Sequence, residues 1–217
     1  MGGEFKVKQN GIIYICFKRV MDVFIGLFGT IFIVLPSSLI IYIIYKIKGY
    51  KGSIFFTQYR VGLKGKKFKI IKFRSMVENA EEVLAANKAL YEKYINNSYK
   101  LPPNEDPRLT NIGDFIRRTS IDEIPQFINL MLGDMSLIGP RPILENELEE
   151  YSKEEQQVLL SVRPGITGMW QVSGRSEVYY PERCEMELYY PRNQSFLLDV
   201  KIFFLTIKKV LSGEGAH

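Results

Sequence analysis

The longest apolar run of the chain is its clearest hydrophobic pattern. Residues 23–45, VFIGLFGTIFIVLPSSLIIYIIY, contain no charged side chain. A helix of this length reaches about 35 Å, enough for the hydrocarbon core of a bilayer. Pro36 and Ser37 lie in the middle, and the proline predicts a kink because it removes a backbone donor. A cleaved signal peptide fits poorly, since the run is long and no small-residue cleavage site follows it.

Basic residues flank both ends of this run, so the charge distribution does not favour a straight crossing. A kink at Pro36 would let the segment enter and leave the membrane on the same side, with both ends at anionic headgroups. Hydroxyl groups of Ser37 and Ser38 are placed to bond the backbone groups that the proline frees. The pattern predicts a re-entrant membrane helix.

Shorter patterns predict the remaining elements. SIFFTQYRVG and KKFKIIKFRSM alternate in polarity around a glycine-containing turn, which predicts a β-hairpin. Helical spacing predicts an amphipathic helix over 78–95, a further helix from about Ile112, and one over 196–211. The last has one apolar face, which suits either core packing or the surface of a membrane. The expected fold class is mixed α/β and mostly helical.

Composition and charge narrow the function. The net charge of +5 indicates an anionic partner, and 46–74 holds ten Lys or Arg without any Asp or Glu. Two cysteines lie far apart outside any CxxC motif, which favours a reducing compartment. The one histidine is His217, the last residue. Catalysis by a Ser-His or Cys-His pair and histidine-rich zinc sites are therefore disfavoured, which leaves carboxylates, hydroxyls, basic side chains or a hard metal ion.

One segment, RRTSIDEIPQ (117–126), places adjacent carboxylates between two isoleucines. Helical spacing runs from Ile124 to Gly133, a natural stop. The helix begins either with a capping box of Ser120 and Glu123 or with Asp122 as N-cap. In both cases the carboxylates lie at a helix N-terminus, which favours an ionised acid or a bound phosphate.

Two loops, GDMSLIGPRP (133–142) and VRPGITG (162–168), each contain an Arg-Pro pair. A residue before proline is held extended, so Arg141 and Arg163 are partly pre-positioned for bidentate phosphate binding. Neighbouring glycines would let the backbone approach a ligand closely. A third loop, GMWQVSGR, offers side chains that could stack on and bond a base, namely Trp170, Gln171, Ser173 and Arg175.

These motifs together resemble the bacterial sugar transferases, the monotopic phosphoglycosyl transferases. The resemblance rests, in order along the chain, on FKRVMD, the proline-broken apolar run, KFRSM, RTSIDEIPQ, GDMSLIGPRP and RPGITGMWQVSGR. The family often has Ser-Pro at the helix break, whereas here Leu35 precedes Pro36 and Ser37 follows it.

The resemblance implies transfer of sugar-1-phosphate from a UDP-sugar to polyprenyl (undecaprenyl) phosphate, with release of UMP. Asp122 would be the nucleophile that forms a phosphosugar intermediate, Glu123 its partner, and both would hold Mg²⁺. Implied ligands of the phosphates or the nucleotide sugar are Lys72, Arg74, Arg118, Arg141, Arg163, Gln171 and Arg175. The implied role is the first membrane step of exopolysaccharide, capsule, O-antigen or glycoprotein glycan assembly, and the loop before DPRLTN favours a hexose donor.

The expected organisation is a membrane segment in residues 1–48 and a small cytosolic catalytic domain with interfacial amphipathic helices in 49–217. The protein would lie on the cytoplasmic face of the inner membrane with both termini inside, without a nucleic-acid partner and with homo-oligomers possible. Two alternatives stay open. One is a glycosyltransferase that moves only the sugar and releases UDP; the other is a membrane-anchored scaffold that binds lipid or nucleic acid through the basic segment.

Overall fold

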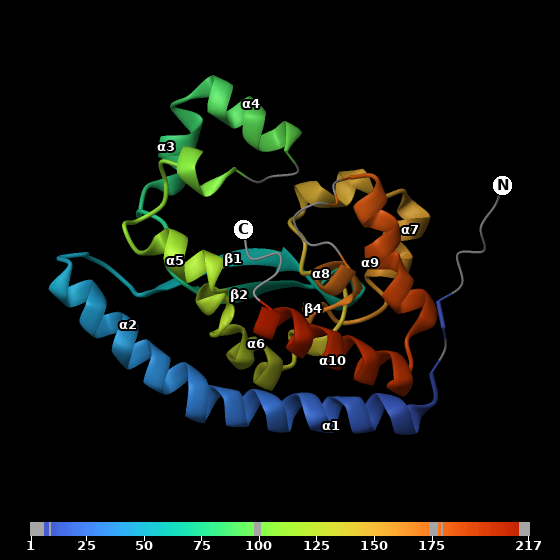
Figure 1. The fold of residues 1–217 in the computed structure, drawn as a ribbon. Helices are drawn as coiled ribbons and strands as arrows, with labels where there is room; N and C mark the ends of the chain where they lie inside the picture. The colour runs from blue at the N-terminus through green and yellow to red at the C-terminus, as the bar shows by residue number, and fades with distance from the viewer. Residues whose placement is uncertain (1–6, 9, 98–100, 174–177, 179, 213–217) are drawn as a thin grey trace.

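The computed structural model describes residues 7–8, 10–97, 101–173, 178 and 180–212, which form a mostly helical body with two small sheets (Figure 1). The predicted mixed α/β, mostly helical class is confirmed. The first half comprises α1 (Ile12–Gly29), a π-helical stretch (Thr30–Val34), α2 (Leu35–Ile47), β1 (Phe55–Val61), β2 (Lys67–Phe73), α3 (Ala80–Ala85), α4 (Lys88–Asn96), α5 (Gly113–Arg118) and α6 (Gln126–Leu132). The second half comprises β3 (Ser136–Ile138), α7 (Lys153–Leu159), β4 (Gly165–Thr167), α8 (Met169–Ser173), α9 (Glu182–Asn193) and α10 (Phe196–Ser212), and short 3₁₀ turns cover Leu63–Gly65, Pro103–Glu105, Ile121–Glu123 and Asn146–Glu150.

The N-terminal apolar run is a bent, continuous helix. Its bend lies in the π-helical stretch before Pro36, where the Leu35 N–H donates to the Thr30 carbonyl five residues back. The break is therefore spread over residues 30–36 rather than centred on the proline, because the wider π turn accommodates the ring without ending the helix. Among the described contacts, the Ser38 hydroxyl donates to the Val34 carbonyl at 2.7 Å, and no such bond comes from Ser37.

One side of this bent helix packs on the rest of the protein along most of its length. Arg19 donates to the carbonyls of Leu130 and Met131 at the end of α6, and buried Asp22 accepts from the Leu137 N–H. Near the other end, the buried Tyr45 hydroxyl donates to the Arg74 carbonyl. The helix is thus an integral wall of the body and not a separate stalk.

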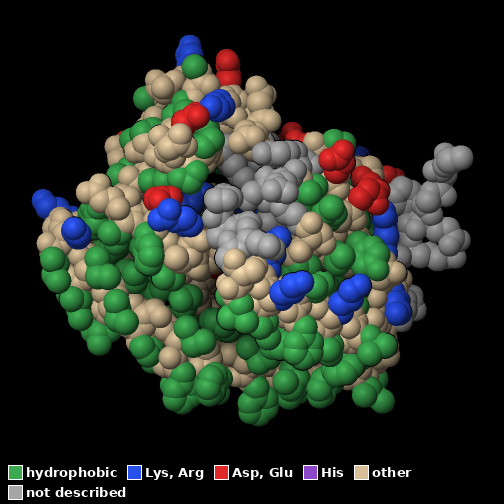
Figure 2. Space-filling view, in the orientation of Figure 1, with side chains coloured by type: hydrophobic (Ala, Val, Ile, Leu, Met, Phe, Trp, Pro, Cys, Tyr) green, Lys and Arg blue, Asp and Glu red, His purple; other side chains and the backbone are tan. Residues whose placement is uncertain are grey.

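The opposite side of the helix is apolar and exposed. Its exposed large side chains are Ile12, Ile13, Ile15, Phe17, Val20, Met21, Phe24, Leu27, Phe28, Ile31, Phe32, Ile33, Leu35, Leu39, Ile40, Tyr42, Ile43 and Ile47. By length and composition alone, Ile12–Ile47 could cross a membrane. Figure 2 shows hydrophobic side chains gathered along the lower margin, over α1, α2 and α10. A patch of this extent marks an interaction surface, and membrane association accounts for it.

The C-terminal helix α10 contributes to the same surface. Phe196, Val200, Phe203, Phe204 and Ile207, the predicted apolar face, are exposed, so core packing of that face is excluded. Ile202 on the other side is fully buried in a cluster with Ile138 and Tyr190. The helix lies beside α1, where Asp199 accepts bonds from Tyr14 and Lys18. This placement agrees with the predicted interfacial amphipathic helix.

The predicted hairpin is confirmed, with β1 and β2 antiparallel from Phe55↔Phe73 to Val61↔Lys67. The single helix expected over 78–95 is wrong. The chain forms α3 and α4 instead, since Asn87 interrupts the helix and caps α4 by accepting a bond from the Leu90 N–H. The two Arg-Pro loops contain β3 and β4, which pair in parallel.

Candidate active site

Backbone geometry between α5 and α6 presents the two adjacent carboxylates. Ser120 adopts the left-handed conformation (φ 56°) and turns the chain into the 3₁₀ turn Ile121–Glu123. Ile121 and Ile124 are half-buried against a core cluster that includes Phe73 and Ile116. With both isoleucines anchored, Asp122 and Glu123 are held together on the remaining sides of the turn.

The predicted caps of the following helix are wrong in detail. The N-cap position of α6 is Pro125, which has no side-chain donor or acceptor, and Ser120 makes no capping bond into its own turn. Asp122 and Glu123 therefore lie one turn ahead of α6. Its far end agrees with the prediction, because Gly133 ends α6 with a left-handed backbone (φ 93°).

Lys72, on β2, bridges the carboxylate pair. Its ammonium group is 3.3 Å from Asp122 Oδ2 and 2.9 Å from Glu123 Oε1. The Asp122 side chain is 11% exposed and that of Lys72 is 22% exposed, so water screens this contact only in part. We name Lys72, Asp122 and Glu123 the dyad cluster.

Burial is the main influence on the protonation of Asp122. It raises the pKa of the Asp122 carboxyl, the charge of Lys72 opposes that rise, and the neighbouring Glu123 adds to it. Arg117 also lowers the pKa of Asp122. A carboxylate in this position needs nearby positive charge to stay ionised, and a phosphorylated ligand would increase that need.

Asn129 fixes the distance between β2 and the carboxylates. This buried side chain accepts from the Ile71 N–H at 3.0 Å and donates to the Lys69 carbonyl at 2.7 Å. These bonds tie the β2 backbone at residues 69 and 71 to α6. Lys72, the next residue along β2, is thereby held beside the turn. The sequence analysis missed Asn129, because its polar side chain within an apolar helix was the only signal.

The structure distinguishes between the two arginines of the doublet. Arg118, the predicted phosphate ligand, is 57% exposed and pairs with Asp114 at 3.5 Å. Arg117 pairs with buried Asp106 at 3.6 Å and is the one that acts on the Asp122 charge. Sequence alone did not indicate which arginine faces the carboxylates.

Other predicted ligands contact protein groups outside the dyad cluster. Arg74 donates to Glu78 and the Lys51 carbonyl, and Arg163 donates to the Gly133 carbonyl at 2.9 Å. Gln171 is in α8, where its Oε1 is buried without a hydrogen bond to the described residues. Arg175 lies outside the residues that the structure describes.

Arg141 belongs to a buried ionic cluster around Glu147. Glu147 is 1% exposed, and Arg60, Arg141 and Arg183 lie 3.3, 3.1 and 3.6 Å from its carboxylate. Burial alone would raise the pKa of Glu147, but the three arginines outweigh it and lower the pKa. The cluster joins β1, the Arg-Pro loop and α9, which the sequence analysis did not foresee.

The glycines of the Arg-Pro loops allow close backbone packing between β3 and β4. A Cβ atom at Gly165 would lie 2.1 Å from the Gly139 nitrogen, and one at Gly168 would lie 2.0 Å from the Gly139 oxygen. The expectation that these glycines open the backbone to a ligand is not met here, since they bring the two strands together.

The dyad cluster has a donor set that fits a hard cation. Among the residues that the structure describes, no group of three or more Asp, Glu, His or Cys side chains is arranged to hold a metal ion by itself. Mg²⁺ commonly takes one or two protein carboxylates and completes its octahedron with water and substrate phosphates. Asp122 and Glu123 supply two carboxylates, so the pair fits an ion shared with a phosphorylated substrate.

Comparison with known proteins places these features in a family. The sequence model of the family described as bacterial sugar transferase matches residues 13–213. Undecaprenyl-phosphate galactose phosphotransferase of Salmonella typhimurium is 41% identical over 203 residues, which cover 92% of this chain and 41% of that protein. UDP-glucose:undecaprenyl-phosphate glucose-1-phosphate transferase of Klebsiella pneumoniae is 37% identical over 98% of this chain and 44% of its own length.

The chain spans about two fifths of the length of these two relatives. A relative of similar size also matches. Exopolysaccharide production protein ExoY of Sinorhizobium fredii is 40% identical over 204 residues, which cover 92% of this chain and 88% of that protein.

Proposed function

The chain belongs to the bacterial sugar transferase family, and from that premise we propose that it transfers a sugar-1-phosphate from a UDP-sugar to polyprenyl phosphate and releases UMP. The observation that carries this proposal is the dyad cluster. It holds a nearly buried carboxylate next to a second carboxylate and an ammonium group, in a protein whose only histidine is the last residue.

In the first step, an Asp122 carboxylate oxygen attacks the phosphorus that carries the sugar. The bond from that phosphorus to the oxygen bridging the two phosphates breaks, and UMP leaves with the bond's electron pair. The phosphosugar remains on the enzyme as an acyl phosphate of Asp122. Splitting the transfer into two displacements lets the nucleotide leave before the bulky lipid arrives.

In the second step, a phosphate oxygen of polyprenyl phosphate attacks the same phosphorus. The bond to Asp122 breaks, the carboxylate is regenerated, and the product is polyprenyl diphosphosugar. Lys72 holds positive charge at the carboxylates in both steps, and Arg117 adds to it. Such charge is needed because each step brings an anionic nucleophile to an anionic phosphate.

Asp122 and Glu123 are the residues that would hold Mg²⁺, and the ion when bound supplies positive charge that neutralises the diphosphate. The other residues implied by the resemblance have separate roles in this account. Arg163 stabilises the end of α6 and Arg74 the loop after α2, whereas Arg118 remains available to the substrate because most of its side chain is exposed.

The donor is a UDP-hexose, and the pathway is exopolysaccharide or capsule assembly. The names of the relatives, which include galactose, glucose and exopolysaccharide production, support this choice. Assays with a panel of UDP-sugars and undecaprenyl phosphate test it. UMP as the nucleotide product supports the proposed reaction, whereas UDP would establish that only the sugar moves.

The protein is monotopic on the cytoplasmic face of the inner membrane, with both ends of the N-terminal helix on the cytoplasmic side. Polar contacts along the helix support this arrangement. If Ile12–Ile47 crossed the bilayer, the groups that contact it, such as the Leu137 N–H at Asp22 and the Arg74 carbonyl at Tyr45, would lie within the hydrocarbon. As a bent, re-entrant helix that enters and leaves the membrane on the same side, the segment buries its apolar side in lipid and keeps the domain in water.

A further inference from the structure

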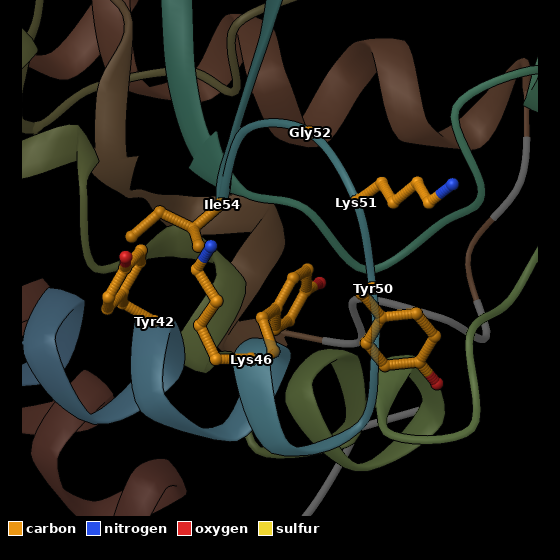
Figure 3. Close-up of a pocket in the computed structure, with 7 residues that line it drawn as sticks. Tyr42, Lys46, Tyr50, Lys51, Gly52 and Ile54 are labelled. Atoms are coloured by element: carbon orange, nitrogen blue, oxygen red, sulfur yellow. The ribbon is translucent and has the colours of Figure 1, made fainter.

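A pocket lies at the end of the membrane-facing helix, outside the dyad cluster. Its volume is about 300 Å³, and it lies between the last turns of α2 and the loop that leads to β1 (Figure 3). That volume is at the lower end of the range for small-ligand sites, about 300–1,000 Å³. The pocket is lined by Tyr42, Tyr45, Lys46, Tyr50, Lys51, Gly52 and Ile54. We call it the lysine–tyrosine pocket.

We propose that the lysine–tyrosine pocket binds the phosphate group of a membrane lipid. The lipid we propose is the polyprenyl phosphate acceptor. This inference rests on the proposed function for its choice of acceptor. The chemistry it requires is only an anionic phosphate carried at the surface of a bilayer.

Position is the first argument. Ile40, Ile43 and Ile47, on the turns of α2 that form one wall, are exposed apolar side chains of the membrane-facing side. The pocket therefore opens where this apolar surface ends and the polar loop begins. Tyrosine is enriched at that depth of a membrane protein because its ring is apolar and its hydroxyl is polar. A lipid held here would keep its chain in the bilayer and present its phosphate to the protein.

Charge is the second argument. Lys46 and Lys51 form no ion pair with any residue that the structure describes, and the Lys46 amine lies 5.5 Å from the centre of the Tyr42 ring. Four other cations of the same basic segment do pair with carboxylates, namely Arg60, Lys67, Lys72 and Arg74. Figure 3 shows the Lys46 amine rising toward Ile54, with Lys51 extending from the loop away from it. Flexible lysines of this kind can converge on a phosphate.

Nearby negative groups are already satisfied. The carbonyl groups of the last turn of α2 accept bonds from the N–H groups of Lys48, Gly49 and Tyr50, so the negative end of the helix is capped. The carboxylate nearest to Gly52 is that of Glu78, which pairs with Arg74 at 2.9 Å. Neither feature leaves uncompensated negative charge to repel an anion.

Hydrogen bonds and packing join the pocket to the dyad region. The Tyr50 hydroxyl accepts from the Asn111 N–H, and Arg74 donates to the Lys51 carbonyl while its guanidinium stacks on Tyr45. Tyr50 and Ile54 also pack against the same core cluster as Ile121 and Ile124. A phosphate bound in the pocket would thus be held by the same packed unit that holds Asp122.

A double variant, Lys46→Gln with Lys51→Gln, tests the proposal. Lys66→Gln is the matched control, because Lys66 is an exposed lysine of the same basic segment that does not line the pocket. In neutral detergent, we expect the KM for undecaprenyl phosphate to rise about 25-fold in the double variant. That change equals about 2 kcal/mol, or about 1 kcal/mol for each lysine at an anionic lipid. The control should stay within about twofold of the wild type.

Two further readouts separate the possible results. UMP release in a single turnover without acceptor should match the wild type, which excludes misfolding and a nucleotide defect. Sedimentation with phosphatidylcholine vesicles that contain phosphatidylglycerol measures binding to ordinary anionic lipid.

Weaker vesicle binding with an unchanged KM would identify phospholipid headgroups as the source of the phosphate and support the pocket. A double variant equal to Lys66→Gln in both KM and vesicle binding would overturn the proposal. A wild type that releases no UMP would refute the proposed function, and the vesicle measurement would then decide the pocket alone.

Discussion

Replacing Lys72 with methionine removes the positive charge of the dyad cluster while keeping a side chain of similar length. At 3.3 Å and an effective dielectric constant of about 20, the attraction between Lys72 and Asp122 is about 5 kcal/mol before desolvation is counted. The net value of one hydrogen bond to a charged group is about 1.5–3 kcal/mol. Because Lys72 makes two such bonds at a partly buried site, we take about 3 kcal/mol as the loss.

The variant should therefore be slow at neutral pH and recover in alkali. Lys72 lowers the pKa of Asp122 against the effect of burial, so its removal raises that pKa further and leaves less of the nucleophile ionised. A loss of about 3 kcal/mol corresponds to a rate decrease on the order of 100-fold at pH 7. Raising the pH restores the ionised form and hence the part of the rate that protonation of Asp122 removes.

Single-turnover release of UMP, measured without acceptor from pH 6 to 9, checks this expectation. Lys67→Met is the control, since Lys67 is on the same strand and its pair with Glu145 is exposed at both ends. A pH profile of Lys72→Met that superimposes on the wild type and on Lys67→Met would refute the electrostatic role of Lys72.

Three other predictions follow from the same geometry. Arg117→Lys should slow UMP release at least fivefold more than Arg118→Lys, because Arg117 acts on the Asp122 charge; equal effects in the same assay would contradict this assignment. Asn129→Ala should lower the free energy of unfolding by about 2–3 kcal/mol in urea titrations, since two partly buried backbone groups of β2 lose their buried side-chain partner; a loss below about 0.5 kcal/mol would show that water replaces it. A single cysteine at residue 5 of a cysteine-free variant should stay unlabelled by an impermeant reagent outside intact cells; efficient labelling would establish a true membrane span.

Much of the fold could be predicted from local pattern. The hairpin follows from alternation, the α6 stop from Gly133, and the apolar surface from the run over residues 23–45. The position of the bend was harder to predict. Pro36 indicates that a bend must exist, but the π-helical stretch before it depends on how the helix packs against α6.

The candidate site was predictable only in part, and for a different reason. Asp122 and Glu123 are adjacent in sequence, so their proximity needs no tertiary information. Lys72 lies 50 residues from Asp122, and only the packing of β2 against the 3₁₀ turn shows that it bridges the carboxylates. For Arg141, the following proline indicates an extended backbone but not that the side chain faces Glu147.

Intact-protein mass spectrometry after incubation with a UDP-hexose, without lipid acceptor, tests the central claim most directly. The account predicts a mass increase of one hexose phosphate on the wild type, with one UMP released per enzyme molecule. Asp122→Asn should show neither change, because an amide does not attack phosphorus. Wild-type turnover without the adduct, or the same adduct on Asp122→Asn, would contradict the covalent role of Asp122.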